Sequence, residues 1–297
     1  MARSAPAVDR VPRLGRLGGL ELTARRVLEG LYAGRHRSPW HGSSHDFADH
    51  RAYQEGDDLR AIDWKAWGRS DRLLVRRWHD DRQLPLLLMI DGSASMAYGD
   101  PAKHARAALL AAALGLLAID QGDAVQAAAC DQAVAWAPVR GGGGAAPALC
   151  GDLGRGALAG AVDAAACLDE AGDRLRRRTL VAWFGDLLTD PLPLAAAAAR
   201  LAARGHEVAV FQVLDASEVR LPAAWGLSRF TDPEGALPEI AADAAAAKPD
   251  YDAAMERHLA ACGAACARAG ADWTLCPGDR EPVDLLAGWL ARRRGHR

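Results

Sequence analysis

The sequence has no long hydrophobic run. Its longest apolar stretch, residues 107–119, falls short of the roughly 20 apolar residues that a membrane-spanning helix needs. The first 19 residues carry arginines but no apolar core, so they lack the composition of a secretory signal. These two absences predict a cytoplasmic protein that does not span a membrane.

An excess of charge of either sign is also absent. The 297 residues include 36 Lys or Arg and 38 Asp or Glu, for a formal net charge of −2, which gives no electrostatic support for nucleic-acid binding. With 50% hydrophobic residues, a chain of this length can bury a large core. The composition therefore predicts a globular protein and excludes intrinsic disorder.

Paired cysteine motifs are missing as well. Of the six cysteines only Cys262 and Cys266 are close in sequence, and their spacing does not form the CxxC pairs of zinc sites. We expect all six to be small buried thiols in a reducing compartment.

The sequence does contain a regular alternation of strands and helices. Short apolar runs bounded by turn residues alternate with longer helical patterns, which is typical of a parallel sheet covered on both faces. This predicts an α/β fold with a doubly wound, mostly parallel sheet and helices on both faces, preceded by a helix and a structured loop segment. The expected strands are residues 73–78, 84–90, 124–130, 180–184, 208–214 and 273–276, and the expected helices are residues 102–119, 155–170, 192–203, 251–269 and 283–293.

Three parts are expected along the chain. Residues 1–19 lack periodicity and are predicted to form a loose tail. Residues 20–84 begin with a short amphipathic helix and continue as a loop rich in Gly, His, Asp, Arg and Trp, which we expect to pack on the main domain. Residues 85–297 are predicted to form that main α/β domain.

Two of the predicted strands end in residues with oxygen side chains. Residues 84–90 run into Asp91, Ser93 and Ser95, and a later strand runs into Asp186. Ligand sites in open α/β sheets form where the strand ends meet the following loops, so these residues are expected to lie together. Carboxylates and hydroxyls are hard oxygen ligands that suit Mg²⁺ or Mn²⁺. The alternative, in which they only form turns and helix caps, stays open from this pattern alone.

This arrangement resembles the metal-ion-dependent adhesion site of von Willebrand factor A-like domains. In this resemblance Asp91, Ser93 and Ser95 match the first ligand motif of the family, and Asp186 matches the third. The resemblance implies that these four residues are metal ligands.

The second ligand motif of that family is a threonine on an intervening loop, and it has no counterpart here. Residues 97–178 contain neither Thr nor Ser. Near the expected place, Asp152 is the only residue with an oxygen side chain. Either Asp152 replaces the threonine, or the site is incomplete and binds metal weakly.

The apolar strand that ends in Asp91 also resembles the start of a phosphatase of the haloacid-dehalogenase type. Such chemistry uses the first Asp as the nucleophile and needs a second carboxylate two residues later as general acid to the leaving group. Ser93 stands at that place, and a hydroxyl does not protonate a leaving group at neutral pH. We therefore expect a protein without enzymatic activity, and the alternative is a metal-dependent phosphohydrolase with Asp91 as nucleophile.

A charged and aromatic loop precedes the first buried strand. Opposite charges alternate along it, which allows Arg–carboxylate pairing, and its aromatic side chains can anchor it by burial. We expect this loop to be a structural element or a partner-binding surface. Its residues are Arg51, Tyr53, Gly56, Asp57, Asp58, Arg60, Asp63 and Trp64.

These motifs occur in an order that resembles the bacterial family named domain of unknown function 58. The similarity covers residues 20–294 and includes both the charged loop and the motif that begins at Asp91. In the second half of the chain it includes Leu214-Asp215, Glu218, Leu221-Pro222, Phe230, Asp232, Glu234-Gly235 and Tyr251.

The resemblance implies a von Willebrand factor A-like protein that acts with a MoxR-type AAA+ ATPase in complex assembly or maturation. Adhesion sites of this kind bind when a carboxylate of the partner completes the coordination sphere of the metal. We therefore predict a non-enzymatic adaptor that uses Mg²⁺ or Mn²⁺ to bind an acidic protein surface. A second form of this hypothesis keeps the adaptor role but has a vestigial metal site, with the charged loop as the partner surface.

Overall fold

The computed structural model describes residues 17–35, 47–52, 67, 74–78, 84–142, 144–156 and 158–294. The chain divides into two compact units, one of residues 1–33 with 84–297 and the other of residues 34–83. In the smaller unit, β1 (Phe47–Ala52) pairs antiparallel with β2 (Leu74–Trp78). The strand predicted for residues 73–78 is therefore present, but it belongs to this two-stranded sheet and not to the main one.

The larger unit is built on a six-stranded sheet with the strand order β10-β7-β6-β3-β4-β5. All neighbouring strands run parallel except β4 and β5, which are antiparallel. The predicted doubly wound, mostly parallel α/β fold is confirmed. The strands are β3 (Leu86–Asp91), β4 (Val125–Cys130), β5 (Val134–Trp136), β6 (Leu180–Gly185), β7 (Glu207–Leu214) and β10 (Asp272–Pro277).

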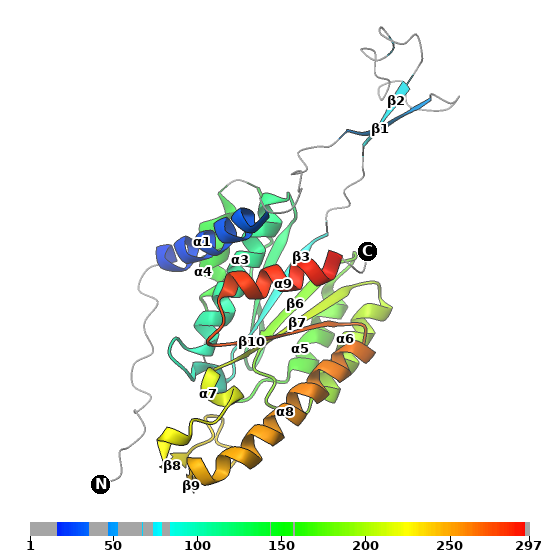
Figure 1. The fold of residues 1–297 in the computed structure, drawn as a ribbon. Helices are drawn as coiled ribbons and strands as arrows, with labels where there is room; N and C mark the ends of the chain where they lie inside the picture. The colour runs from blue at the N-terminus through cyan, green and yellow to red at the C-terminus, as the bar shows by residue number, and fades with distance from the viewer. Residues whose placement is uncertain are drawn as a thin grey trace. The chain divides into compact units, whose positions relative to one another are not determined.

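Both faces of this sheet are covered by helices (Figure 1). Along β3, Leu86, Leu88 and Ile90 belong to one hydrophobic core, whereas Leu87 and Met89 belong to the other. Because every residue of β3 is buried, residues 86–90 form a continuous apolar run that ends at Asp91. The first core is closed by α1 (Leu17–Arg35), α3 (Lys103–Asp120), α4 (Ala145–Leu153) and α9 (Pro282–Arg294), and the second by α5 (Ala164–Arg174), α6 (Pro191–Ala203) and α8 (Ala244–Arg268).

Helix α1 belongs with the main sheet and not with the segment that follows it. Its apolar residues, including Leu20, Ala24 and Leu28, are buried in the same core as α3. The predicted grouping of residues 20–84 therefore differs from the structure, in which residues 34–83 form the separate unit. The helical spacing located an amphipathic helix, but it carried no information on which core the helix joins. The packing of residues 34–83 against the main unit stays a prediction.

The helix predicted for residues 155–170 is present only in its second part, because α5 begins at Ala164. The chain forms α4 before this segment and α5 at its end, with a loop between them. Gly156 and Gly160 in that loop have φ values of 144° and 64°, a backbone region that glycine enters readily and that ends a helix. These glycines therefore separate α4 from α5 within the segment that was predicted as one helix.

A segment between β7 and α8 carries short elements that the sequence did not predict. They are α7 (Ala216–Val219), a 3₁₀ turn η3 (Ala223–Trp225), and the antiparallel pair β8 (Leu227–Phe230) and β9 (Ile240–Asp243). Helix α8 also begins at Ala244, because the Asp243 side chain caps it and the helix continues through Pro249. Figure 1 shows α7, β8 and β9 gathered at one end of the sheet.

The six cysteines are free and buried, as predicted. None of the helices described here is long and apolar enough to cross a membrane.

Candidate functional site

The centre of the sheet brings Asp91 and Asp186 to one edge. Strands β3 and β6 are parallel neighbours with Ile90 opposite Phe184, so Asp91 at the end of β3 and Asp186 just after β6 share the carboxyl edge. The strand order reverses between these two strands, which is the place where ligands bind in doubly wound folds. The negative charge of Asp186 also raises the pKa of Asp91, although burial contributes more.

The turn after β3 places two hydroxyls beside Asp91. The Ser93 backbone N–H donates to Asp91 Oδ1 at 2.8 Å, and Ser93 Oγ lies 2.9 Å from Ser95 Oγ. The loop between α4 and α5 braces this turn through backbone hydrogen bonds, from Ala94 N to Gly160 O and from Ala159 N to Gly92 O. The structure therefore gathers the oxygen atoms that the sequence motif predicted.

Asp91 lies in an environment that disfavours an uncompensated negative charge. Only 6% of the residue is exposed. The pKa of Asp91 is raised from 3.8 to about 7, mainly by burial and also by the charges of Asp186 and Glu234, whereas hydrogen bonds from Ser93 act in the opposite direction. A cation next to Asp91 would stabilise its ionised form.

The sequence did not reveal Lys103, which lies at the start of α3 and is 2% exposed. Its ammonium donates to Asp186 Oδ2 at 2.8 Å and to Glu218 Oε1 at 2.6 Å. Although burial disfavours the ammonium, these two carboxylates raise the pKa of Lys103. One signal was present in the sequence, namely a lysine in the first turn of a predicted helix. A positive charge there interacts unfavourably with the helix dipole, so its presence indicates a specific partner.

Glu218 connects α7 to this group. Its Oε2 accepts the backbone N–H of Asp215 at 2.8 Å, and the Asp215 side chain in turn caps α7. The Tyr251 hydroxyl donates to the backbone carbonyl of Glu218 at 2.7 Å. Asp215, Glu218 and Tyr251, which were part of the family resemblance, are therefore joined by hydrogen bonds beside Lys103.

Glu234 adds a further carboxylate from the turn between β8 and β9. Asp232 organises this turn by accepting the backbone N–H groups of Glu234, Ala236 and Leu237, each at 2.9 Å. Burial raises the pKa of Glu234, whereas a hydrogen bond with the Ser95 side chain lowers it. Sequence reasoning missed Glu234 as a site residue because the turn and the strand ends meet only in the folded chain.

Asp152 has other partners. It lies at the end of α4, where Arg140 donates to its Oδ2 from Nε at 3.0 Å and from Nη2 at 2.9 Å. Arg155 Nη1 lies 3.3 Å from its Oδ1. The polar contacts of the Asp152 side chain are thus with arginines, and among the described residues none links it to Asp91 or Asp186. This placement does not support Asp152 as the replacement for the missing threonine.

The charged loop is largely outside the described residues. Arg51 contributes its backbone to β1, opposite Val75 of β2. The other predicted members lie outside the description, so their role as a partner surface stays a prediction. They are Tyr53, Gly56, Asp57, Asp58, Arg60, Asp63 and Trp64.

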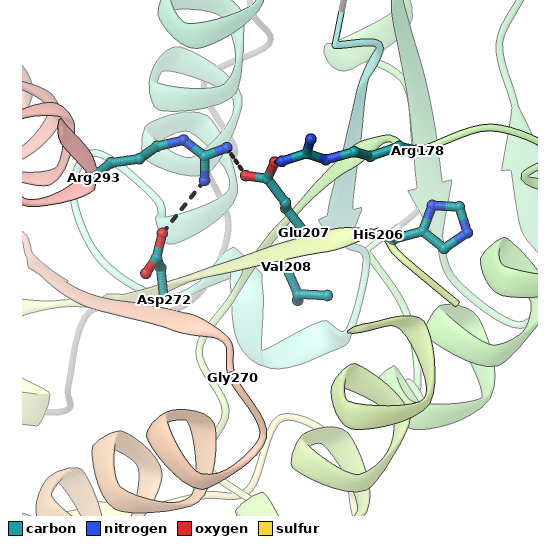
Figure 2. Close-up of a pocket in the computed structure, with 7 residues that line it drawn as sticks. All are labelled: Arg178, His206, Glu207, Val208, Gly270, Asp272 and Arg293. Carbon is teal, nitrogen blue, oxygen red and sulfur yellow. Dashed lines mark hydrogen bonds and ion pairs between the residues drawn. The ribbon is translucent and has the colours of Figure 1, made fainter. Parts of the chain in front are cut away.

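A surface pocket lies at the opposite edge of the sheet, where β7 and β10 begin (Figure 2). Glu207 accepts a hydrogen bond from Arg178 at 2.5 Å and forms an ion pair with Arg293, which also lies 3.5 Å from Asp272. Because these charges pair with one another, we interpret the pocket as a structural ion-pair network. Its lining residues are Arg178, His206, Glu207, Val208, Gly270, Asp272 and Arg293.

The donor atoms at the carboxyl edge fit a hard divalent cation. Asp91, Ser93 and Ser95 supply a carboxylate and two hydroxyls, and Asp186 supplies a second carboxylate that is shared with Lys103. Within the described ranges, no group of three or more His, Cys, Asp or Glu side chains is arranged to hold a metal. A metal at this edge would therefore need the serine hydroxyls as ligands.

Comparisons with known proteins give a family and a set of uncharacterised relatives. The family model "Protein of unknown function DUF58" matches residues 49–261. An uncharacterised protein of Mycobacterium tuberculosis is 29% identical over 293 residues, which cover 93% of this chain and 88% of the relative. A protein of Mycobacterium bovis, also uncharacterised, matches with the same identity and coverage.

Two solved structures are similar to this chain at low sequence identity. An aerotolerance-related membrane protein from Bacteroides fragilis has a TM-score of 0.47 at 14% identity, covering 72% of this chain and 100% of that one. The SpRpn10 VWA domain has a TM-score of 0.38 at 10% identity, covering 71% of this chain and 95% of that one.

Proposed function

The chain belongs to the DUF58 family, whose function is unknown, and from this premise we propose that it is a protein-binding adaptor whose strand-end site holds Mg²⁺ or Mn²⁺. The bound cation would attract an acidic side chain of a partner protein. One observation carries the proposal: Asp91, Ser93, Ser95 and Asp186 converge at the place where the strand order reverses.

The chemistry of the donor set favours binding over catalysis. Of the three ligands that would hold the ion, only Asp91 is charged and the two hydroxyls are neutral, so a divalent ion would keep part of its positive charge and its attraction for another carboxylate. Asp91 and the two serines would hold the ion, and Asp186 would add negative charge beside it. The burial of Asp91 supports this assignment. Burial disfavours the ionised carboxylate, and a bound cation would stabilise it.

The partner that the family resemblance implies is a MoxR-type AAA+ ATPase, and the proposed role is in complex assembly or maturation. An acidic surface on this ATPase or on its client would provide the carboxylate. The adaptor is non-enzymatic in this proposal, because Ser93 stands where phosphatase chemistry would need a general acid.

The experiment combines metal binding with capture of the partner. Mg²⁺ binding is measured by calorimetry on the wild type and on Asp91→Ala, and each protein is used to pull down the MoxR-type ATPase with and without a chelator. The matched control is Asp169→Ala, which removes an exposed carboxylate of α5 that pairs with Arg200.

We expect Mg²⁺ binding and capture to be lost in Asp91→Ala and kept in Asp169→Ala. Capture that survives both the chelator and Asp91→Ala would contradict the metal bridge. A screen with generic phosphatase substrates tests the alternative, and turnover that is abolished by Asp91→Asn would replace the adaptor with a phosphohydrolase.

A further inference from the structure

Lys103 is a buried cation beside the proposed metal site. It is one of three lysines in the chain, and the structure buries it almost completely at the first position of α3. Burial of an ammonium and its location at the positive end of a helix dipole are both unfavourable. Specific ion pairs must offset these two costs.

The ion pairs of Lys103 are specific and held by the surrounding structure. Its ammonium bridges Asp186 Oδ2, just after β6, and Glu218 Oε1 in α7, which follows β7. Glu218 is fixed by its own contacts, since its second oxygen caps α7 and its backbone carbonyl accepts from Tyr251. The ammonium therefore occupies a defined position on the carboxylate that a metal at the site would also use.

We propose that Lys103 is the built-in counter-ion of this site: it neutralises Asp186 when no metal is bound and lowers the affinity for a divalent cation. This inference rests on the proposed function. The physical reason is that two cations close to one carboxylate repel each other, and that Asp186 Oδ2 already accepts a short hydrogen bond from the ammonium.

This role has a consequence for partner binding. Because Lys103 weakens the hold on the ion, a carboxylate from the partner adds the negative charge that retains it. Metal and partner then bind more tightly together than either binds alone. Lys103 acts as a positioning residue here, since its 2% exposure keeps it from meeting the partner directly.

The test measures divalent-cation affinity after the ammonium is removed. Mg²⁺ and Mn²⁺ are titrated into the wild type and Lys103→Met by calorimetry, and the melting temperature is measured in chelator and in Mg²⁺. The matched control is Lys248→Met, whose ammonium pairs with Asp252 at 2.7 Å in α8. Since Lys103→Met leaves two acids without their cation, the double variant Lys103→Met/Glu218→Gln removes one charge of each sign.

We expect the Lys103 variants to bind Mg²⁺ at least about tenfold more tightly than the wild type and Lys248→Met. Mg²⁺ should also raise their melting temperatures more than that of the wild type. Unchanged or weaker binding in the double variant would overturn the inference and leave the proposed function intact. Metal binding by the Lys103 variants alone would support the inference and overturn the metal bridge of the wild type. An absence of metal binding in all four proteins would overturn both.

Discussion

At the scale of single residues, Gly185 provides the space that the Asp91 carboxylate occupies. A Cβ at residue 185 would lie 2.7 Å from Asp91 Oδ2 and 2.7 Å from Trp183 Nε1. Both neighbouring side chains are buried, so neither can move into solvent without disturbing the core. A side chain at this position would therefore displace the carboxylate.

Gly185→Ala is predicted to lower the free energy of unfolding by about 1–3 kcal/mol through overpacking, and to weaken Mg²⁺ binding. Urea denaturation and calorimetry measure the two effects. The control is Gly288→Ala in α9, where the nearest atom to a new Cβ is 3.7 Å away, so stability should stay the same or rise slightly. Equal effects of the two substitutions would contradict the steric argument.

Asp152→Asn is predicted to leave Mg²⁺ affinity unchanged and to lower the free energy of unfolding by about 1–3 kcal/mol, because Arg140 loses a charged acceptor in a part-buried pair. Calorimetry and denaturation on the same preparation separate the two quantities. A loss of metal binding without a loss of stability would restore Asp152 as a ligand.

The sequence was informative for some site residues and not for others. Asp91, Ser93, Ser95 and Asp186 follow predicted strands directly, so the rule about strand ends located them. Lys103 meets its two carboxylates across 83 and 115 residues of sequence, and no local pattern specifies contacts of that kind. Glu234 was missed for the same reason.

At the scale of elements, α7 and the β8–β9 pair complete the edge at which the parallel strands end. The turn between β8 and β9 depends on Asp232, whose carboxylate accepts three backbone N–H groups. These hydrogen bonds fix the backbone that carries Glu234. The placement of a site residue thus depends on a single side chain in a solvent-exposed turn.

Asp232→Ala is predicted to speed hydrogen exchange at the amides of Glu234, Ala236 and Leu237, while the amides of β3 keep their protection. The reason is that the three amides lose their acceptor, whereas the buried sheet is unaffected. Hydrogen-exchange mass spectrometry of the wild type and the variant measures this directly. Unchanged exchange in the turn would show that other contacts fix it.

The central strands of the main sheet were predictable because a strand that is buried on both faces needs apolar residues at consecutive positions. The strand β5 and the β8–β9 pair are short and partly exposed, so they leave no such pattern. The start of the helix in the α4–α5 region was predicted wrongly for another reason, because Gly156 and Gly160 adopt positive φ values and form a loop there.

At the scale of the whole molecule, the fold concentrates negative charge where two central strands end. Four acidic residues from three regions of the chain lie there: Asp91, Asp186, Glu218 and Glu234. Among the described residues, Lys103 forms ion pairs with two of them, Asp186 and Glu218. Near neutrality of the chain as a whole therefore coexists with a strongly acidic edge. A bound divalent cation would stabilise the protein by reducing this repulsion.

The pH dependence of stability tests this charge distribution in the absence of metal. The pKa of Asp91 is raised from 3.8 to about 7, mainly by burial, so the folded protein holds this proton more tightly than the unfolded chain. The contribution of Asp91 to stability therefore falls as the pH rises from about 4 to about 7. In the presence of a chelator, we expect the free energy of unfolding of Asp91→Asn, measured by urea denaturation, to increase relative to that of the wild type as the pH rises over this range. A constant difference would contradict the burial of an ionisable Asp91.

The most direct test of the central claim is a crystal structure of the protein grown with Mn²⁺, with data collected for the anomalous signal of the metal. The account predicts a peak bounded by Asp91, Ser93 and Ser95, beside Asp186 at the ends of β3 and β6. A structure that orders this edge without a metal peak, or that binds Mn²⁺ only elsewhere, would contradict it.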